Sequence, residues 1–334
     1  MSDLYTVDGP SPQEPTAWKP IPLKNVLQDS TGYRPDPGLV DAVNVALTLG
    51  MPLLVTGEPG VGKTALADSV ARRLGLGDPL KFVAKSESRA SDLFFTYDRL
   101  LRFQESHCTN EPLDFKKYIS YVALGQAILN SRSREEWGGL LDGKPHDGPK
   151  RSVVLIDEID KAPRDFVNDL LVEIERLAFP PLPDMPNQMS MEADPNLAPV
   201  VIITSNQERS LPDPFLRRCV YYHIPFPNHK QLQEIVEVRM KKLFNPQTQP
   251  AWLARAMELF WWLREGVKPE LRRKPGLGEL LTWLVFLGER AIGQSSLKDS
   301  FLFETACPLM LKTSLDQGRQ EALIKVWTSS SKQG

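Results

Sequence analysis

One stretch of eight residues decides the fold of this chain: Gly57-Glu58-Pro59-Gly60-Val61-Gly62-Lys63-Thr64. It matches the phosphate-binding pattern G-x-x-x-x-G-K-[ST] at every position. The apolar run 53–56 before it predicts a buried strand, and residues 65–74 after it predict a helix. In that order, glycines let backbone N–H groups turn toward phosphate oxygens, and the helix directs its positive dipole end at the same anion. Lys63 is then expected to reach the β- and γ-phosphates, and the Thr64 hydroxyl to ligate Mg²⁺.

The composition is that of an ordinary globular protein. The chain has 334 residues, of which 41% are hydrophobic and 25% charged, enough to bury a sizeable core. A formal charge of −2 gives no electrostatic argument for a nucleic-acid partner, although a local basic patch remains compatible with it. The cysteines, at 108, 219 and 307, are widely spaced, which fits a reducing compartment. With no run of 18 apolar residues and no signal-peptide pattern, we expect a cytoplasmic protein without a membrane segment.

The pattern along the chain predicts three parts. Residues 1–30 are rich in proline and are expected to form an arm. Between 31 and 226, short apolar runs alternate with helical patterns, which predicts an α/β domain with a parallel sheet flanked by helices. Within it, residues 118–129 are expected to be helical. The aromatic cluster at 93–97 fits either a place in the core or a place in a pore loop. From 227 to 334 only helical patterns occur, which predicts an all-helical lid domain.

An acidic pair follows the predicted strand at 153–156. Asp157 and Glu158 would lie at the carboxyl end of that strand, where open α/β sheets bind their ligands. In a nucleoside triphosphatase Asp157 would hold Mg²⁺ and Glu158 would polarise the attacking water. The alternative is an acidic turn that caps the following helix.

Two further polar elements lie downstream. Asn206 ends the predicted strand at 200–204 and would orient the attacking water, unless it is a simple turn residue. Arg217 and Arg218 end a short apolar segment before the strand at 220–224. A guanidinium there would suit the γ-phosphate held by a neighbouring subunit, because it stabilises charge spread over phosphate oxygens. The alternative is a solvated charge pair.

With these elements in order, the chain resembles the AAA+ ATPases, and among them the MoxR family and the related CbbQ-type activases. The resemblance covers residues 31–226, with a weaker match beyond. The segments that carry it are 33–37, 57–64, 91–93, 153–161, 201–206 and 211–219.

The resemblance implies ATP and Mg²⁺ as cofactors, and Mg²⁺-dependent ATP hydrolysis as the activity. Thr64 and Asp157 would ligate the metal, Asn206 would be sensor 1, and Arg218 would act in trans beside Arg217. The segments 98–142 and 179–199 would face the pore or the ring surface. The residues implied to contact the nucleotide are Gly57, Glu58, Pro59, Gly60, Val61, Gly62, Lys63, Thr64, Ala65, Asp157, Tyr33 and, from the lid, Lys274.

The lid departs from the family pattern at one position. Where many members carry a sensor 2 arginine, this chain has Gly278. Arg272, Arg273 and Lys274 are the nearby candidates to replace it, and the other interpretation is that the lid makes no such contact.

The expected function is that of an ATP-hydrolysing homo-oligomeric ring, most often a hexamer in this family, that remodels, activates or assembles a protein partner. The family usually works with a protein carrying a von Willebrand A domain, whose Asp-x-Ser-x-Ser motif is absent here, so that partner would be another chain. Two alternatives stay open: a motor acting on nucleic acid, and an ATP-bound switch or scaffold with little turnover.

Overall fold

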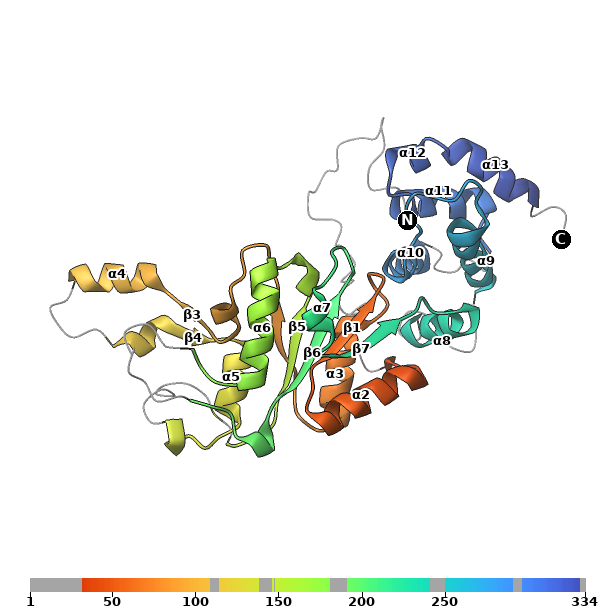
Figure 1. The fold of residues 1–334 in the computed structure, drawn as a ribbon. Coiled ribbons are helices and arrows are strands. Elements are labelled where there is room, and N and C mark those ends of the chain that lie inside the picture. Colours follow the sequence, from red (N-terminus) through yellow and green to blue (C-terminus); the bar gives the residue numbers. More distant parts are fainter. Residues whose placement is uncertain are drawn as a thin grey trace. The chain divides into compact units, whose positions relative to one another are not determined.

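The computed structural model describes residues 32–108, 114–137, 146, 148–180, 191–240, 250–290 and 296–330. These divide into two compact units (Figure 1). The first comprises residues 33–58 and 62–226, and the second comprises the described residues from 227 onward together with Gly32 and residues 59–61. The predicted arm at 1–30 and parts of the segments 98–142 and 179–199 lie outside the described residues.

A five-stranded parallel sheet forms the centre of the first unit. Its strands are β1 (Leu53–Gly57), β2 (Leu80–Val83), β5 (Val153–Asp157), β6 (Val200–Ser205) and β7 (Val220–Ile224). Their order across the sheet is β2-β5-β6-β1-β7, and every pairing is parallel. Strand β1 and the apolar part of β5 are completely buried, as expected where helices cover a parallel sheet. The predicted α/β fold is therefore confirmed.

The helices of the first unit begin and end at clear sequence signals. Helix α2 (Pro37–Leu49) is capped by Asp36, whose carboxylate accepts from the Leu39 N–H at 3.1 Å, and it ends at Gly50 with a φ of 65°. Helix α6 (Arg164–Arg176) follows Pro163. The remaining α-helices described in this unit are α3 (Lys63–Arg73), α4 (Arg99–Cys108), α5 (Ala123–Asn130) and α7 (Asp213–Leu216).

The helix predicted over 118–129 is wrong in its first part. Residues Ile119–Tyr121 form strand β4, which pairs antiparallel with β3 (Phe95–Tyr97), and α5 begins only at Ala123. The reason is the pairing with a distant segment, which the Val122 N–H extends by donating to the Phe94 carbonyl at 2.9 Å. Figure 1 shows α4 at the end of this two-stranded extension.

The aromatic cluster at 93–97 belongs mainly to the core. Leu93 and Phe94 are completely buried, and the Phe94 ring packs against Phe179 with centroids 5.8 Å apart. Phe179 in turn lies at the base of the 179–199 segment, where its N–H donates to the Met191 carbonyl at 2.9 Å. The core interpretation of the cluster is therefore the one that the packing supports.

The second unit is helical throughout its described part, as predicted. Trp252 and Trp283 are buried in its interior, so these tryptophans have a packing role. The last two helices are separate elements, with Gly318 as the C-cap of the first of them. The elements are α8 (His229–Met240), α9 (Ala251–Trp261), which continues as a π-helical turn (Trp262–Gly266), α10 (Leu277–Arg290), α11 (Asp299–Met310), α12 (Ser314–Gln317) and α13 (Gln320–Ser330).

Candidate functional site

The phosphate-binding pattern forms the connection between β1 and α3, in the predicted strand–loop–helix order. Gly60 and Gly62 have φ values of 85° and 98°, in the left-handed region that residues with a side chain rarely adopt. At Gly62 there is also no room for a side chain, because a Cβ atom would lie 2.8 Å from the Tyr33 ring. The backbone of this loop thus favours glycine at position 60 and requires it at position 62, the second glycine that the pattern fixes.

Lys63 is the first residue of α3, and its side chain turns back into the loop. It is only 6% exposed, and its Nζ donates to the Gly57 carbonyl at 2.7 Å and the Glu58 carbonyl at 2.9 Å. Burial lowers the pKa of Lys63, while the carboxylates of Asp157 and neighbouring acidic residues oppose that effect. A cation held in a loop of this geometry fits an anionic phosphate group as its ligand.

Thr64 and Asp157 are brought together from two elements of the fold. The Thr64 hydroxyl lies 3.2 and 3.1 Å from the two carboxylate oxygens of Asp157. Asp157 also accepts a short hydrogen bond from the Thr204 hydroxyl of β6. A hydroxyl and a carboxylate are hard oxygen ligands of the kind that Mg²⁺ prefers, so this pair fits the predicted metal.

The described residues offer no larger group of metal ligands beside this pair. In the part of the chain that the structure describes, no three His, Cys, Asp or Glu side chains are grouped to hold a metal ion. That is the usual situation for Mg²⁺ bound with a nucleotide, where phosphates and waters complete the shell.

Glu158 has a strained backbone at the end of β5. Its φ and ψ are 58° and 46°, left-handed values that are uncommon outside glycine and cluster at functional sites. Its N–H donates to the Thr204 hydroxyl at 3.0 Å. One carboxylate oxygen lies 2.6 Å from the Lys161 Nζ, and the other lies 3.5 Å from the Asn206 side-chain amide. The conformation therefore points the predicted water-activating carboxylate at the predicted sensor.

Asp160 fixes the loop that carries Asn206. It is 3% exposed, and its two carboxylate oxygens accept from the N–H groups of Asn206 at 3.2 Å and Glu208 at 2.9 Å. It does not cap α6, where Pro163 is the N-cap and no side-chain cap bond forms. Sequence reasoning missed this role of Asp160 and that of Thr204. The one signal for Thr204 was a polar residue inside a buried apolar strand.

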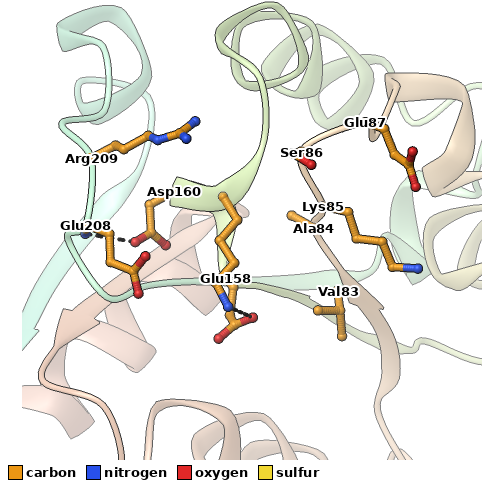
Figure 2. Close-up of a pocket in the computed structure, with 10 residues that line it drawn as sticks. Val83, Ala84, Lys85, Ser86, Glu87, Glu158, Asp160, Glu208 and Arg209 are labelled. Carbon is orange, nitrogen blue, oxygen red and sulfur yellow. Dashed lines mark hydrogen bonds and ion pairs between the residues drawn. The ribbon is translucent and has the colours of Figure 1, made fainter. Parts of the chain in front are cut away.

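A cavity of about 590 Å³ lies beside Glu158, at the carboxyl ends of β2 and β5 (Figure 2). Figure 2 shows Glu158 between Glu208 and Asp160 on one side and Lys85 on the other. The lining is strongly charged and carries both signs. Its residues are Val83, Ala84, Lys85, Ser86, Glu87, Glu158, Asp160, Lys161, Glu208 and Arg209.

The two arginines lie at the opposite end of the sheet. Arg218 precedes β7, whose first residue pairs with Leu53 at the start of β1, whereas the loop begins at Gly57 at the end of β1. A strand of five residues spans about 16 Å, so Arg218 does not share an edge of the sheet with the chain's own phosphate loop. Both arginines are exposed, and the Arg218 Nε lies 3.6 Å from a carboxylate oxygen of Glu175.

Tyr33 and Lys274, two further predicted nucleotide contacts, are not bonded to Lys63, Thr64, Asp157, Glu158 or Asn206 in the described part of the chain. The Tyr33 ring lies against Gly62, and burial, followed by the nearby Asp36 carboxylate, raises the pKa of Tyr33. Lys274 belongs to the second unit, where its Nζ lies 3.3 Å from a Glu270 carboxylate oxygen. Its contact with a nucleotide, like a replacement of sensor 2 near Gly278, stays a prediction.

Fold and site together define a class of protein, a nucleotide-binding ATPase built on a parallel sheet with a phosphate loop after its first strand. Residues 53–228 match the model of the ATPase family associated with various cellular activities (AAA), and the chain belongs to this family. No curated protein matches the chain. Membership indicates nucleotide binding and ATP hydrolysis in general, whereas the MoxR branch is not distinguished by it.

Two solved structures resemble the chain at low identity. A point mutant of RuvB from Thermotoga maritima is 17% identical, with a TM-score of 0.44 over 80% of this chain and 66% of RuvB. Hsp104 in a closed state with ATPγS and FITC casein is 18% identical, with a TM-score of 0.42 over 77% of this chain and 44% of Hsp104. The chain therefore spans about two thirds of RuvB and less than half of Hsp104. At these values neither structure bears on its substrate or partner.

None of the helices in the described part of the chain is long and apolar enough to cross a membrane.

Proposed function

We propose that this protein is a MoxR-like AAA+ motor that hydrolyses ATP with Mg²⁺, works as a homo-oligomeric ring and remodels, activates or assembles a protein partner. One observation carries the proposal. Five predicted site residues converge at the carboxyl edge of one sheet: Lys63, Thr64, Asp157, Glu158 and Asn206. Lys63 contacts the loop backbone, Thr64 contacts Asp157, and Glu158 faces Asn206.

The residues divide the chemistry between them. The loop N–H groups and Lys63 bind the phosphates, and Thr64 and Asp157 hold Mg²⁺, which would neutralise developing charge on the phosphates when bound. Glu158 accepts a proton from the attacking water through a carboxylate oxygen. The Asn206 amide, 3.5 Å from that carboxylate, orients the same water.

The position of Arg218 supports the proposed ring. Since that residue lies at the amino end of β7, its guanidinium would act on the nucleotide of another copy and not on that of its own chain. By family resemblance the ring is a hexamer and the partner a protein, for which a separate chain with a von Willebrand A domain is the first candidate. The expected location is the cytoplasm.

A switch with little turnover is the second candidate, and one observation favours it. Glu158 is engaged by Lys161 at 2.6 Å, so one of the two oxygens that would accept a proton is occupied. A motor acting on nucleic acid is less well supported, because the net charge of −2 offers no electrostatic attraction to phosphate backbones.

The test is steady-state ATP turnover measured against protein concentration, with the molecular mass determined with and without ATP and Mg²⁺. The motor predicts that activity per chain rises cooperatively with concentration while a ring-sized mass appears. A monomer that binds ATP without turning it over would favour the switch. Salt-sensitive binding of DNA or RNA that stimulates turnover would favour the nucleic-acid motor.

A further inference from the structure

Lys161 has no part in the chemistry described above, yet it makes the closest contact with Glu158. Its Nζ lies 2.6 Å from Glu158 Oε2, and both side chains are partly exposed. We propose that Lys161 is a positioning residue that restrains Glu158 in the resting enzyme, and that Glu208 is the carboxylate to which Lys161 transfers when Glu158 is released. This inference rests on the proposed ATP hydrolysis and adds a restraint on that same site.

The backbone holds Lys161 within reach of Glu158. Ile159–Lys161 form a single 3₁₀ turn directly after β5, closed by the Lys161 N–H donating to the Glu158 carbonyl at 3.0 Å. Ile159, the first residue of this turn, and Ala162, which follows it, are both buried, so the turn is anchored to the core. The ion pair therefore arises from a fixed local geometry, while the long lysine stem remains able to move its ammonium group.

The contact occupies the atom that catalysis needs. Glu158 Oε1 faces the Asn206 amide at 3.5 Å, and Oε2 accepts from Lys161, so both oxygens have a donor. A water molecule that is to lose its proton must itself donate to one of these oxygens. While Lys161 stays on Oε2, it takes one of the acceptor positions of that oxygen and holds the carboxylate in place, which restricts its approach to the water.

Glu208 is the carboxylate proposed to accept the Lys161 ammonium when Lys161 leaves Glu158. The Glu158 bond contributes most to the raised pKa of Lys161, and the charges of Glu208 and Asp160 add to it. Asp160 is buried and its two oxygens already accept backbone N–H groups, whereas the Glu208 side chain is exposed. Figure 2 shows Glu208 near Glu158 at the cavity, and Lys161 lines the same cavity.

Glu208 also ties this transfer to the sensor. It lies two residues after Asn206, and Asp160 binds the N–H groups of both. A shift of the Asn206 loop would therefore carry Glu208 with it and change its distance from Lys161.

The first test is Lys161→Met against Lys161→Arg, with kcat and KM for ATP measured on the full chain without any partner. Lys161→Met is expected to raise basal kcat about two- to fivefold, the factor that an exposed ion pair typically contributes, with KM little changed. Lys161→Arg restores the cation and should behave as wild type. Lys81→Met, which removes a lysine that pairs with Asp68 and does not line the cavity, is the matched control and should leave kcat unchanged.

Glu208→Gln tests the second half of the proposal. Loss of the acceptor should lower basal kcat about twofold in the wild-type background, and it should have no effect on top of Lys161→Met. A kcat for Lys161→Met at or below that of wild type, or equal effects of Glu208→Gln in both backgrounds, would overturn the proposal.

Failure of the restraint differs from failure of the motor. If wild type shows no turnover, the motor that works without a partner is refuted. The restraint would still hold if Lys161→Met gained turnover, and it would fail if that variant also stayed inactive. Lys161→Gln, which also lacks the charge, gives an independent measurement should the Met variant fold poorly, as judged by its thermal unfolding.

Discussion

The two ends of the same parallel sheet differ in how their functional side chains are held. At the carboxyl end, Lys63, Thr64 and Asp157 are bonded to the loop or to each other. At the amino end, Arg217 and Arg218 are exposed before β7. The residues at the carboxyl end are thus held in place by contacts within one chain, whereas the proposed function assigns the exposed arginines at the amino end to a neighbouring copy.

The contact that holds Arg218 is weak. Its Nε lies 3.6 Å from Glu175 Oε1, and both side chains are about half exposed. Such a pair contributes at most about 1 kcal/mol, so a phosphate of a neighbouring copy could replace the carboxylate at little cost. The Arg218 side chain can therefore leave its intrachain contact at little cost, whereas Lys63 and Thr64 at the carboxyl end are held by contacts within the site.

The largest effect is expected from Arg218→Ala. Removing a trans-acting arginine should lower kcat about 10³-fold, because the guanidinium stabilises charge in the transition state, and should leave ATP affinity intact. Turnover and equilibrium nucleotide binding measure the two separately. Arg217→Ala, at the neighbouring arginine, is the matched control and is expected to lower kcat less. A larger loss of kcat for Arg217→Ala than for Arg218→Ala would assign the trans-acting role to Arg217.

Mixing two inactive variants tests whether the amino end acts in trans. A ring assembled from Arg218→Ala and Glu158→Gln chains contains interfaces where an intact Arg218 faces an intact Glu158. Turnover should therefore reappear on mixing, up to a fraction of the wild-type rate. Two variants that stay inactive in a demonstrably mixed ring would show that both residues act on the same chain's nucleotide.

Glu158→Gln is the corresponding change at the carboxyl end. The amide keeps the shape of the side chain but cannot accept the proton, so kcat should fall about 10²-fold or more while ATP stays bound. Single-turnover hydrolysis with prebound ATP measures the chemical step directly. Turnover close to the wild-type rate would mean that Glu158 is not the base.

Lys63→Met should weaken nucleotide binding itself. The change removes a buried cation and leaves the carbonyls of Gly57 and Glu58 without their donor, so we expect the Kd for ATP to rise at least about tenfold. Equilibrium binding of a fluorescent ATP analogue gives this number. Lys81→Met is the control, because it breaks only an exposed ion pair with Asp68 and should not alter affinity.

The carboxyl end could be predicted well from the sequence because its signals are local. Apolar runs such as 53–56 and 153–156 form strands wherever helices cover them, and residues after parallel strands must meet at one edge. Their convergence follows from topology alone, so Lys63, Asp157 and Asn206 could be placed there without coordinates. Their roles in hydrolysis stay predictions.

What could not be predicted depends on contacts between distant segments. The pairing of Phe95–Tyr97 with Ile119–Tyr121 has no local signature and overrides the helical pattern of residues 118–122. The left-handed backbone of Glu158 is rare for a residue with a side chain, and its bond to Thr204 spans 46 positions. The partners of Asp160 and Lys161 likewise appear only once the strands are in place.

The smallest effect compares two glycines at the two ends of α3. Gly62 precedes the helix at the phosphate loop, and Gly75 follows it at the other end, with φ values of 98° and 68°. Alanine at either position adds backbone strain of about 1–2 kcal/mol, so both variants should lose a few degrees of Tm. Only at Gly62 would the new Cβ meet the Tyr33 ring, whereas nothing lies within 4 Å at Gly75.

That contact separates the two variants in nucleotide binding. Gly62→Ala must push the Tyr33 ring aside and reshape the loop, so its ATP affinity should fall several-fold while that of Gly75→Ala stays at the wild-type value. Thermal unfolding and ATP binding measured on both proteins give the comparison. Equal affinities at equal Tm would mean that the Tyr33 ring and the loop backbone at Gly62 do not form part of the nucleotide site.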